Sequence, residues 1–503
     1  MNAAVIGSMQ LPDASHRLLH RARRSECREP APGTMIAAGW TLSDQPGLGA
    51  SSRRTPRVDS MAKFAGIALN AALLCSTPLA VAAAPGPQPQ PLPLATPAAV
   101  GLSTQRLEHM TEHFRAEAAR QSAAGYVLMV ARNGKLAYSS AVGMRDREHD
   151  VPMTLDTRFR IASMTKPVTS VAVLMLYEEG RFQLDDPVSR YLPEFSELRV
   201  QTSTDDQGAQ KTEPAKRPIT IRHLLTHTAG LGYGPAYDST SALGKAWAAL
   251  NFSGPGTLAD KVRAIAGLPL YYHPGDAWRY SYADDVLGRL VEVVSGLPFD
   301  RFLKMHLFDP LGMRHTGFYI SQADLGQLAV LYRHDAKGDL VLSDTVSAQA
   351  ATDASKSPSG GGGLISTAGD YLRFAQMLAN GGSFEGRLYL SPVTVALMTS
   401  NQVPDDAQAK FWGESWRGFG YGLGVGVVTD GRSVPQASCD GDYSWGGFFD
   451  THWITSPRTG IVAVLLTQVD PRGASAPQRT DADFHNLLFA SVSSPRPLPC
   501  LAH

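Results

Sequence analysis

Residues 159–180 read FRIASMTKPVTSVAVLMLYEEG, and the rest of the chain is organised around this stretch. The run from Val168 to Tyr177 is almost continuously apolar and is followed by a glycine, which predicts a buried helix with a glycine cap. Pro167 has no N–H to donate and is tolerated only in a first turn, so the helix should begin close to Ser163. Residues three apart share a helix face, which puts the Lys166 amine within reach of the Ser163 hydroxyl. The pair predicts an activated serine nucleophile.

Length and charge exclude several classes of protein. The chain has 503 residues, 43% of them hydrophobic, enough for one large domain or two to three ordinary ones. Lys plus Arg and Asp plus Glu both total 46. The chain therefore lacks the basic surplus of a nucleic-acid binder, and no nucleic-acid partner is expected. Its cysteines match no zinc or redox spacing, so neither a metal site nor a cofactor is predicted; they are Cys27, Cys75, Cys439 and Cys500.

The first 97 residues are expected to precede the folded domain. Residues 1–60 are rich in Arg, Ser, Pro and Gly, and are interpreted as an over-extended gene start or a translated, disordered leader. Residues 61–84 have a charged start, a short apolar centre and small residues at the end, which predicts a signal peptide too short to span a membrane. Residues 85–97 are proline-rich and predict a stiff linker.

A signal peptide implies export to the periplasm or secretion, with no stable membrane span after cleavage. The mature chain would keep only Cys439 and Cys500. An oxidising compartment permits a disulfide between them without requiring one.

Residues 98–495 are predicted to form one α/β domain with strands at its two ends. Tyr126–Ala131 and Leu136–Val142 flank an Asn-Gly turn and predict a β-hairpin. Three strands are expected near the other end, at 421–428, 447–454 and 461–467, before a closing helix. The middle is predominantly helical, with an exposed polar loop at 201–217. Because strands from both ends must meet, we predict one sheet made from the two termini, with a mostly helical insertion.

Tyr280 is a candidate general base. It lies in the stretch WRYSYADDVLG, residues 278–288, just before a predicted helix. A phenol titrates near 10 in water, but beside lysine-type cations it loses its proton more readily and can act as a base. The plain alternative is a core tyrosine with a satisfied hydroxyl.

Residues 444–450, SWGGFFD, enter a predicted strand and carry two adjacent glycines. Glycine lets a backbone N–H approach a substrate closely. The N–H groups of Ser163 and Phe448 would then form an oxyanion hole. The same glycines would also fit a β-bulge.

Together these motifs resemble those of the serine β-lactamase and penicillin-binding-protein superfamily, most closely its class C-like esterase branch. Its three motifs look like SMTK at 163–166, YSY at 280–282 and WGG at 445–447 of this chain. The stretch THTAGL at 226–231 is also similar to the sequence that members of the superfamily usually carry. The resemblance spans roughly Ala98 to Val492. It implies a β-lactamase-like fold whose antiparallel sheet is built from both chain ends, flanked by helices, with a helical insertion subdomain.

The resemblance also implies two-step acyl transfer, in which a small-molecule acyl substrate forms an acyl-enzyme on Ser163 while Lys166 and Tyr280 draw off its proton. Which of the two is the primary base stays open. The implied oxyanion and substrate-binding residues are Trp445, Gly446, Gly447, Phe448 and Tyr282.

Two departures from the family pattern bear on the substrate. Tyr282 stands where the antibiotic-processing members usually carry Asn, and Trp445-Gly446-Gly447 replaces their Lys-Thr-Gly. A charge-assisted contact of the missing Lys to an anionic substrate is worth about 1.5–3 kcal/mol. We therefore expect carboxylic esters, with β-lactamase, D-amino-acid peptidase or acyltransferase activity as alternatives. A catalytically silent acyl-binding sensor is the non-enzyme alternative.

Two rival sites are less well supported. An α/β-hydrolase would show a Gly-x-Ser-x-Gly elbow, which the sequence lacks. His109 with His113, and His223 with His227, are each four apart, but neither pair has the Glu and third ligand of a metalloprotease. These histidines are expected to be surface or packing residues.

Overall fold

The computed structural model describes most of the chain from residue 91 onward. It covers residues 91–204, 210–234, 254–404, 417–472 and 479–493, with 238, 240–250, 252, 407 and 500. The chain divides into two units, Met1–Ala82 and Ala83–His503, and all of these residues belong to the second. The predicted leader at 1–60 and signal peptide at 61–84 lie outside the described residues.

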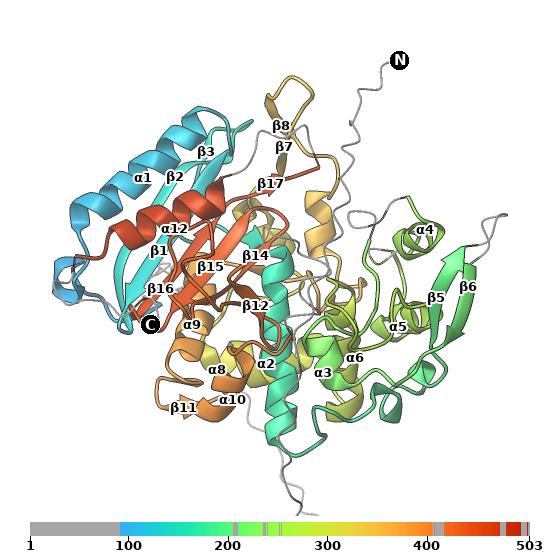
Figure 1. Ribbon diagram of the computed structural model, residues 1–503. Helices are drawn as coiled ribbons and strands as arrows, with labels where there is room; N and C mark the ends of the chain where they lie inside the picture. Colours follow the sequence, from blue (N-terminus) through green and yellow to red (C-terminus); the bar gives the residue numbers. More distant parts are fainter. Residues whose placement is uncertain are drawn as a thin grey trace, which may run out of the picture. The chain divides into compact units, whose positions relative to one another are not determined.

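An eight-stranded antiparallel sheet joins the two ends of the domain (Figure 1). Its strand order is β12-β13-β14-β15-β16-β1-β2-β3. The hairpin of β1 and β2 meets the C-terminal strands where β1 pairs with β16, with Val127 opposite Leu466. The predicted sheet made from both termini is therefore confirmed. The strands are β1 (Gly125–Arg132), β2 (Lys135–Asp146), β3 (Val151–Pro152), β12 (Phe419–Tyr421), β13 (Gly426–Val428), β14 (Tyr443–Gly447), β15 (Thr451–Ser456) and β16 (Ile461–Leu466).

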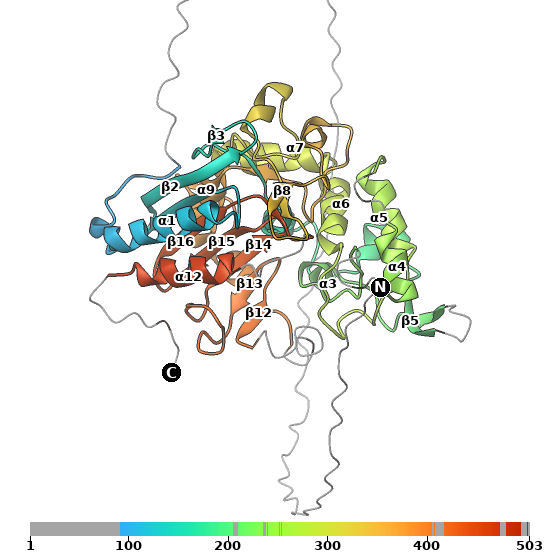
Figure 2. The same cartoon turned by 90° about the horizontal axis from the view of Figure 1, so that it is seen from above.

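Helices cover both faces of this sheet. Helices α1 (Thr104–Ala119) and α12 (Thr480–Ala490) lie side by side over one face (Figure 2), and α9 (Ala368–Ala379) packs on the other. Every residue of β1 and β16 is buried. Successive strand residues point to opposite faces, so Leu128 belongs to the core under α1 while Val127 belongs to the larger core around α2 and α9. Two buried faces explain why these strands are continuously apolar.

The predicted buried helix is α2 (Thr165–Glu178), which packs against α6 (Ala283–Ser295). Almost all of α2 is buried, and Gly180 follows it in the left-handed conformation that favours glycine, with a φ of 71°. The other helices of the insertion are α3 (Ile221–Leu225), α4 (Ala242–Ala248), α5 (Leu258–Ala266), α7 (Phe299–Leu303), α8 (Asp309–Leu311) and α10 (Pro392–Met398).

Short elements complete the described part of the domain. The 3-10 and π turns are η1 (Ala98–Val100), η2 (Ala162–Met164), η3 (Val188–Arg190), η4 (Pro193–Phe195), η5 (Lys304–Phe308), η6 (Gln322–Gln327) and η7 (Ala348–Thr352). The remaining strands are β4 (Phe159–Arg160), β5 (Arg199–Thr204), β6 (Gln210–Pro214), β7 (Tyr332–His334), β8 (Leu340–Leu342), β9 (Ile365–Ser366), β10 (Ser383–Phe384), β11 (Arg387–Leu388) and β17 (Val469–Asp470). Among the residues covered, no helix has the length and apolar character needed to cross a bilayer.

The polar stretch predicted as an exposed loop at 201–217 contains the β5–β6 hairpin, with Arg199 opposite Pro214. Its Thr, Gln and Lys side chains show no alternating apolar pattern, so no strand could be predicted there. The hairpin is held by backbone pairing and by Arg199, whose guanidinium donates to the Thr212 hydroxyl and carbonyl, each at 2.7 Å.

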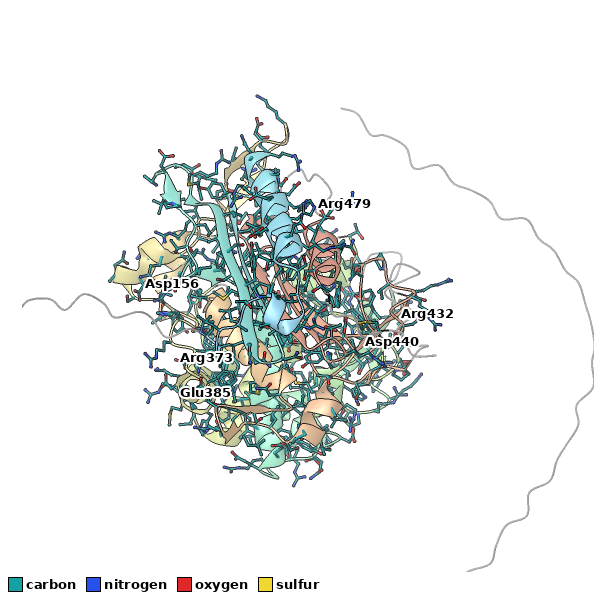
Figure 3. The ribbon with its side chains drawn as sticks, turned by 90° about the vertical axis from the view of Figure 1, so that its left-hand side faces the viewer. Asp156, Arg373, Glu385, Arg432, Asp440 and Arg479 are labelled. Carbon is teal, nitrogen blue, oxygen red and sulfur yellow. A yellow bond between two sulfur atoms is a disulfide. The ribbon has the colours of Figure 1, made fainter. Side chains whose placement is uncertain are left out.

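The proline-rich segment predicted as a linker, 85–97, is packed onto the domain from residue 91. Leu92 is only 4% exposed, and the backbone at Pro93 and Ala95 hydrogen-bonds to Leu136 of β2. Arg373 also donates to the Pro91 carbonyl and pairs with Glu385, both at 2.9 Å (Figure 3). Burial of an apolar side chain at the sheet edge thus makes residues 91–97, predicted as part of the linker, part of the folded unit.

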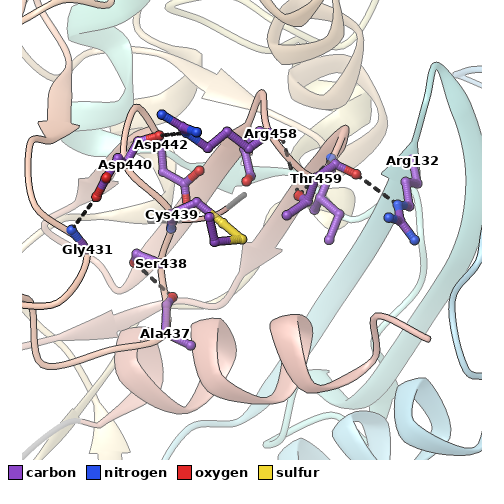
Figure 4. The surroundings of a disulfide bond; sticks show 12 residues. Arg132, Gly431, Ala437, Ser438, Cys439, Asp440, Asp442, Arg458 and Thr459 are labelled. Carbon is purple, nitrogen blue, oxygen red and sulfur yellow. Dashed lines mark hydrogen bonds between the residues drawn. A yellow bond between two sulfur atoms is a disulfide. The ribbon is translucent and has the colours of Figure 1, made fainter. Parts of the chain in front are cut away.

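Cys439 and Cys500 form a disulfide, with their Cα atoms 4.3 Å apart (Figure 4). The Asp440 N–H donates to the Cys500 carbonyl at 2.8 Å, and Arg458 Nε donates to the Asp440 carbonyl at 2.7 Å. The bond therefore attaches residue 500 to the turn that leads into β14. The pairing that the sequence left open is present.

Candidate active site

Ser163 lies in the turn η2, between β4 and α2. β4 pairs with β9, and Ala162 then adopts a φ of 43°, an uncommon value for a residue with a side chain. This turn directs the chain from the strand into the helix, and the Met164 N–H closes it by donating to the Ile161 carbonyl at 3.0 Å. Ser163 is partly exposed and lines a cavity, as a nucleophile at a strand-to-helix junction should.

Lys166 is fully buried in the first turn of α2. Its Nζ donates to the Gly361 carbonyl at 2.5 Å. The same nitrogen lies 4.6 Å from the centroid of the Tyr280 ring and 5.4 Å from that of Tyr233. Two aromatic faces and a carbonyl oxygen thus surround this amine, an environment suited to an ammonium group.

Tyr280 joins the second and third motifs. Its side chain is 5% exposed, and its hydroxyl oxygen accepts a hydrogen bond from Trp445 Nε1 at 3.3 Å. Its ring centroid lies 4.7 Å from the ring of His227. Tyr280 therefore contacts Lys166 on one side and Trp445 on another, which brings the three sequence motifs together.

Gly447 brings the end of β14 against the turn that carries Ser163. A Cβ on Gly447 would lie 2.3 Å from the Ile161 carbonyl oxygen and 2.1 Å from Thr451 Oγ1. Thr451 Oγ1 also donates to that carbonyl at 3.2 Å. The β14–β15 pairing runs without a register shift to Gly447 opposite Thr451, so this glycine serves a close approach of backbones and not a bulge.

A cavity of about 730 Å³ opens between these elements. Ser163 and Tyr280 line it, together with the four predicted residues Trp445, Gly446, Gly447 and Phe448. Many of its other lining residues are aromatic or glycine, and Arg472, His452 and Asp481 add ionisable side chains to those of the tyrosines. The lining residues include Ala162, Ser163, Tyr233, Gly234, Tyr280, Gly362, Phe419, Ser444, Trp445, Gly446, Gly447, Phe448 and Phe449.

Tyr282 was predicted to bind substrate, and the structure places it elsewhere. It is the residue before α6, and its ring stacks on Phe252 at 4.9 Å and contacts Tyr233 at 4.6 Å. It is 9% exposed and belongs to the main apolar core, and it is absent from the residues that line the cavity. Its ring packs against that of Tyr233, which lines the cavity, so Tyr282 supports this part of the wall.

Three residues near the site were not predicted. Tyr233 follows the THTAGL motif, and no pattern in the sequence distinguishes it from a core tyrosine. Gly361 belongs to the four-glycine run at 360–363, which does not have the spacing of a phosphate-binding loop. A Cβ on Gly361 would lie 2.7 Å from Asp285 Oδ2, so the glycine run was the available signal of a close approach. Asp285 is a fully buried carboxylate, and its place just before a predicted helix gave no sign of that burial.

The titratable groups around Lys166 are shifted mainly by burial. Burial, with help from the charge of Lys166, lowers the pKa of His227 well below its usual value, so its imidazole is neutral. Burial raises the pKa of Asp284 to about 7 and that of Asp285 in the same direction, while the charge of Lys166 opposes both shifts. Burial also raises the pKa of Tyr233, which stays a neutral phenol.

The paired histidines have separate structural roles. His113 Nε2 lies 3.2 Å from Asp483 Oδ2 between α1 and α12, and His223 completes a capping box with Thr220 at the start of α3. His227 lies 3.3 Å from Asp284 beside Tyr280. Within the described ranges, no group of three or more His, Cys, Asp or Glu side chains is placed to hold a metal ion.

Comparisons with known proteins agree with this geometry. A family model described as Beta-lactamase matches residues 110–487. Protein Rv1367c of Mycobacterium tuberculosis (strain ATCC 25618 / H37Rv) is 39% identical over 355 residues, covering 69% of this chain and 86% of its own. Esterase EstB of Burkholderia gladioli is 34% identical over 375 residues, covering 70% and 88%.

Among solved structures, EstCE1, described as a hydrolase with promiscuous acyltransferase activity, matches with a TM-score of 0.64 and 30% identity. The match covers 76% of this chain and 99% of that one. It confirms the predicted β-lactamase-like fold.

Proposed function

The chain belongs to the beta-lactamase family and is a serine hydrolase of its esterase-like kind, and from this premise we propose that carboxylic esters acylate Ser163. The observation that carries the proposal is the position of Tyr280. Its ring lies 4.6 Å from Lys166 Nζ, its hydroxyl accepts from Trp445, and it lines the same cavity as Ser163. A hydroxyl, an amine and a phenol around one cavity are the groups that acyl transfer needs.

In the first step, Tyr280 and Lys166 together draw the proton from Ser163 Oγ as this oxygen attacks the ester carbonyl carbon. The N–H groups of Ser163 and Phe448 donate to the oxyanion that forms. The bond to the alcohol oxygen then breaks, and that oxygen takes the proton from the Tyr280–Lys166 pair. Alcohol leaves, and the acyl group stays on Ser163.

In the second step, water enters and gives a proton to the same pair while its oxygen bonds to the acyl carbon. Ser163 Oγ then leaves with that proton, and the carboxylic acid departs. The close contact of Gly447 with Ile161 supports the proposed oxyanion hole. It brings the edge of β14, which precedes Phe448, beside the turn that carries the Ser163 N–H.

The cavity favours uncharged acyl substrates. Its walls near Ser163 are aromatic, from Tyr233, Tyr280, Trp445 and Phe448. Trp445, at the position of the family's usual Lys, donates its indole N–H to Tyr280 and brings no positive charge. The guanidinium of Arg472, which lies 5.4 Å from the centroid of the Phe448 ring, is already held by both oxygens of Asp470 at 2.9 and 2.8 Å. A carboxylate on the substrate would therefore gain little at these positions.

Acyl transfer to an alcohol is the second candidate. It would use the same acyl-enzyme, with an acceptor hydroxyl in place of water. The cavity volume of about 730 Å³ can hold an acceptor as well as an acyl group. EstCE1, which is described with both activities, makes this a natural comparison.

Export through a signal peptide at 61–84 is also proposed. Disulfides persist mainly in oxidising compartments, and the Cys439–Cys500 bond fits such a location. N-terminal sequencing of the protein recovered from its native host tests this; a mature terminus near residue 85 is expected, and an intact terminus upstream of residue 61 would contradict it.

The proposed activity is tested with purified protein on p-nitrophenyl esters, a chromogenic cephalosporin and a D-amino-acid amide. We expect the ester to turn over fastest, and release of an acyl ester when an alcohol is added would favour the transferase. Ser163→Ala should abolish hydrolysis with the fold intact, and Tyr280→Phe should lower kcat by several orders of magnitude. A cephalosporin that turns over faster than every ester would overturn the substrate assignment.

A further inference from the structure

Asp285 is a buried carboxylate for which the reaction above has no use. It lies in the first turn of α6 and is 1% exposed. Its Oδ1 accepts hydrogen bonds from Ser359 Oγ at 2.6 Å and from the Gly361 N–H at 3.2 Å. Burial raises the pKa of this carboxyl, and the nearby charge of Lys166 and these two donors act in the opposite direction, in favour of the ionised form. A charge kept at such a depth needs a partner.

Gly361 connects this carboxylate to Lys166. Its N–H is held by Asp285, and its carbonyl accepts from Lys166 Nζ at 2.5 Å. A Cβ on Gly361 would lie 2.7 Å from Asp285 Oδ2 and 3.2 Å from Lys166 Nζ. The two charged atoms are therefore within about 6 Å of each other, a distance at which opposite charges still interact strongly in a buried site.

The other titratable groups that face Lys166 are poorer sources of a negative charge than Asp285. Below pH 7, Asp284 is mostly protonated, because burial raises its pKa to about 7. His227 is neutral, and Tyr233 stays a phenol. Lys261 of α5 also acts on Asp285, but its amine donates to the Phe252 carbonyl. Of the two carboxylates next to Lys166, only Asp285 accepts hydrogen bonds from neighbouring donors at Ser359 and Gly361.

We propose that Asp285 is a positioning residue for acyl transfer: it fixes the glycine loop whose carbonyl holds Lys166, and it balances the ammonium charge beside Tyr280. This role rests on the proposed function of Ser163. An ammonium group has no lone pair to accept a proton, so Tyr280 receives the proton of Ser163 while Lys166 stabilises the phenolate. By keeping Lys166 protonated, Asp285 makes Tyr280 the base and Lys166 the group that stabilises it, a distinction that the sequence motifs left open.

Asp285→Asn tests the charge, because the amide keeps the size of the side chain and an oxygen for the Ser359 and Gly361 donors. We expect kcat on a p-nitrophenyl ester to fall about 10- to 100-fold with KM changed by less than about twofold, since Asp285 does not touch substrate. Loss of the negative charge of Asp285 lowers the pKa values of the neighbouring Lys166 and Tyr280. Both limbs of the pH profile of kcat/KM should therefore move to lower pH, by about one to two units.

Asp284→Asn is the matched control, with the same change at the neighbouring buried carboxylate. It should leave the acidic limb unshifted where that limb lies below pH 7, because Asp284 is already mostly protonated there. Equal losses in both variants, or an Asp285→Asn enzyme within about threefold of wild type with an unshifted profile, would overturn the proposal.

Ser359→Ala covers the case in which Asp285→Asn does not fold. Ser359 is partly exposed and gives Asp285 one hydrogen bond. Its removal should lower kcat by about three- to tenfold at constant KM, and an unchanged kcat would count against the proposal. A wild-type enzyme that hydrolyses no ester would refute the proposed function, and with it this role. An active wild type with an unaffected Asp285→Asn variant would refute the role of Asp285 alone.

Discussion

Adding one methyl group to Gly447 should disable the site without touching any catalytic side chain. The new Cβ would lie 2.3 Å from the Ile161 carbonyl oxygen and 2.1 Å from Thr451 Oγ1, well inside van der Waals contact. To restore an ordinary contact, the β14 edge and the turn before Ser163 must separate by about 1 Å. A misplacement of about 1 Å can lower a rate about 100-fold, and overpacking of this kind costs about 1–3 kcal/mol of folding free energy.

We therefore expect Gly447→Ala to lower kcat/KM on a p-nitrophenyl ester about 100-fold and to lower Tm by several degrees while the protein remains folded. The comparison is Gly446→Ala in the same strand, where a Cβ would lie 3.4 Å from the Thr451 carbonyl oxygen and 3.5 Å from His452 Nδ1, both ordinary contacts. This variant should lose less than about tenfold. A Gly447→Ala enzyme within about threefold of wild type would show that the β14 edge does not shape the oxyanion hole.

Three further outcomes are expected. Reduction of the disulfide, whose cysteines are 61 residues apart, should lower the free energy of unfolding by about 4 kcal/mol in the chain-entropy limit, and identical urea midpoints with and without dithiothreitol would contradict this. Tyr282→Phe should change kcat/KM by less than about threefold, since its ring lies in the core; a loss near that of Tyr280→Phe would return it to the site. Against the effect of burial, hydrogen bonds to Asp450 and Asp481 raise the pKa of His452 to about 10. That stabilisation is complete below about pH 6.5 and is lost as the pH rises through 10, so Asp481→Asn should reduce the urea midpoint more at pH 6 than at pH 10.5. Equal reductions at the two pH values would argue against a charged His452.

The sequence located the nucleophile turn because its signals are local. A proline, an apolar run and a glycine define where α2 begins and ends, and they also place Ser163 and Lys166 one turn apart. The hairpin of β1 and β2 and the apolar strand β16 likewise have patterns that can be read without a partner. The two ends of the chain had to meet because neither can bury its strands alone.

The contacts that the sequence did not reveal are made across long separations. Lys166 and Gly361 are 195 residues apart. A run of glycines indicates that another group approaches the backbone closely, but it does not identify that group. The position of Tyr282 against Tyr233 could not be predicted, because its place in a motif says nothing about which way the chain turns at the start of α6. Leu92 was read as part of a linker because its burial depends on the free edge of β2, a feature of the assembled sheet.

Intact-protein mass spectrometry of the enzyme mixed rapidly with a p-nitrophenyl ester tests the central claim most directly. The account predicts a transient mass increase of one acyl group that peptide mapping assigns to Ser163. The adduct should be absent in Ser163→Ala, and in Tyr280→Phe it should form and decay far more slowly. An acyl group found on another residue, or ester hydrolysis undiminished in Ser163→Ala, would contradict the account.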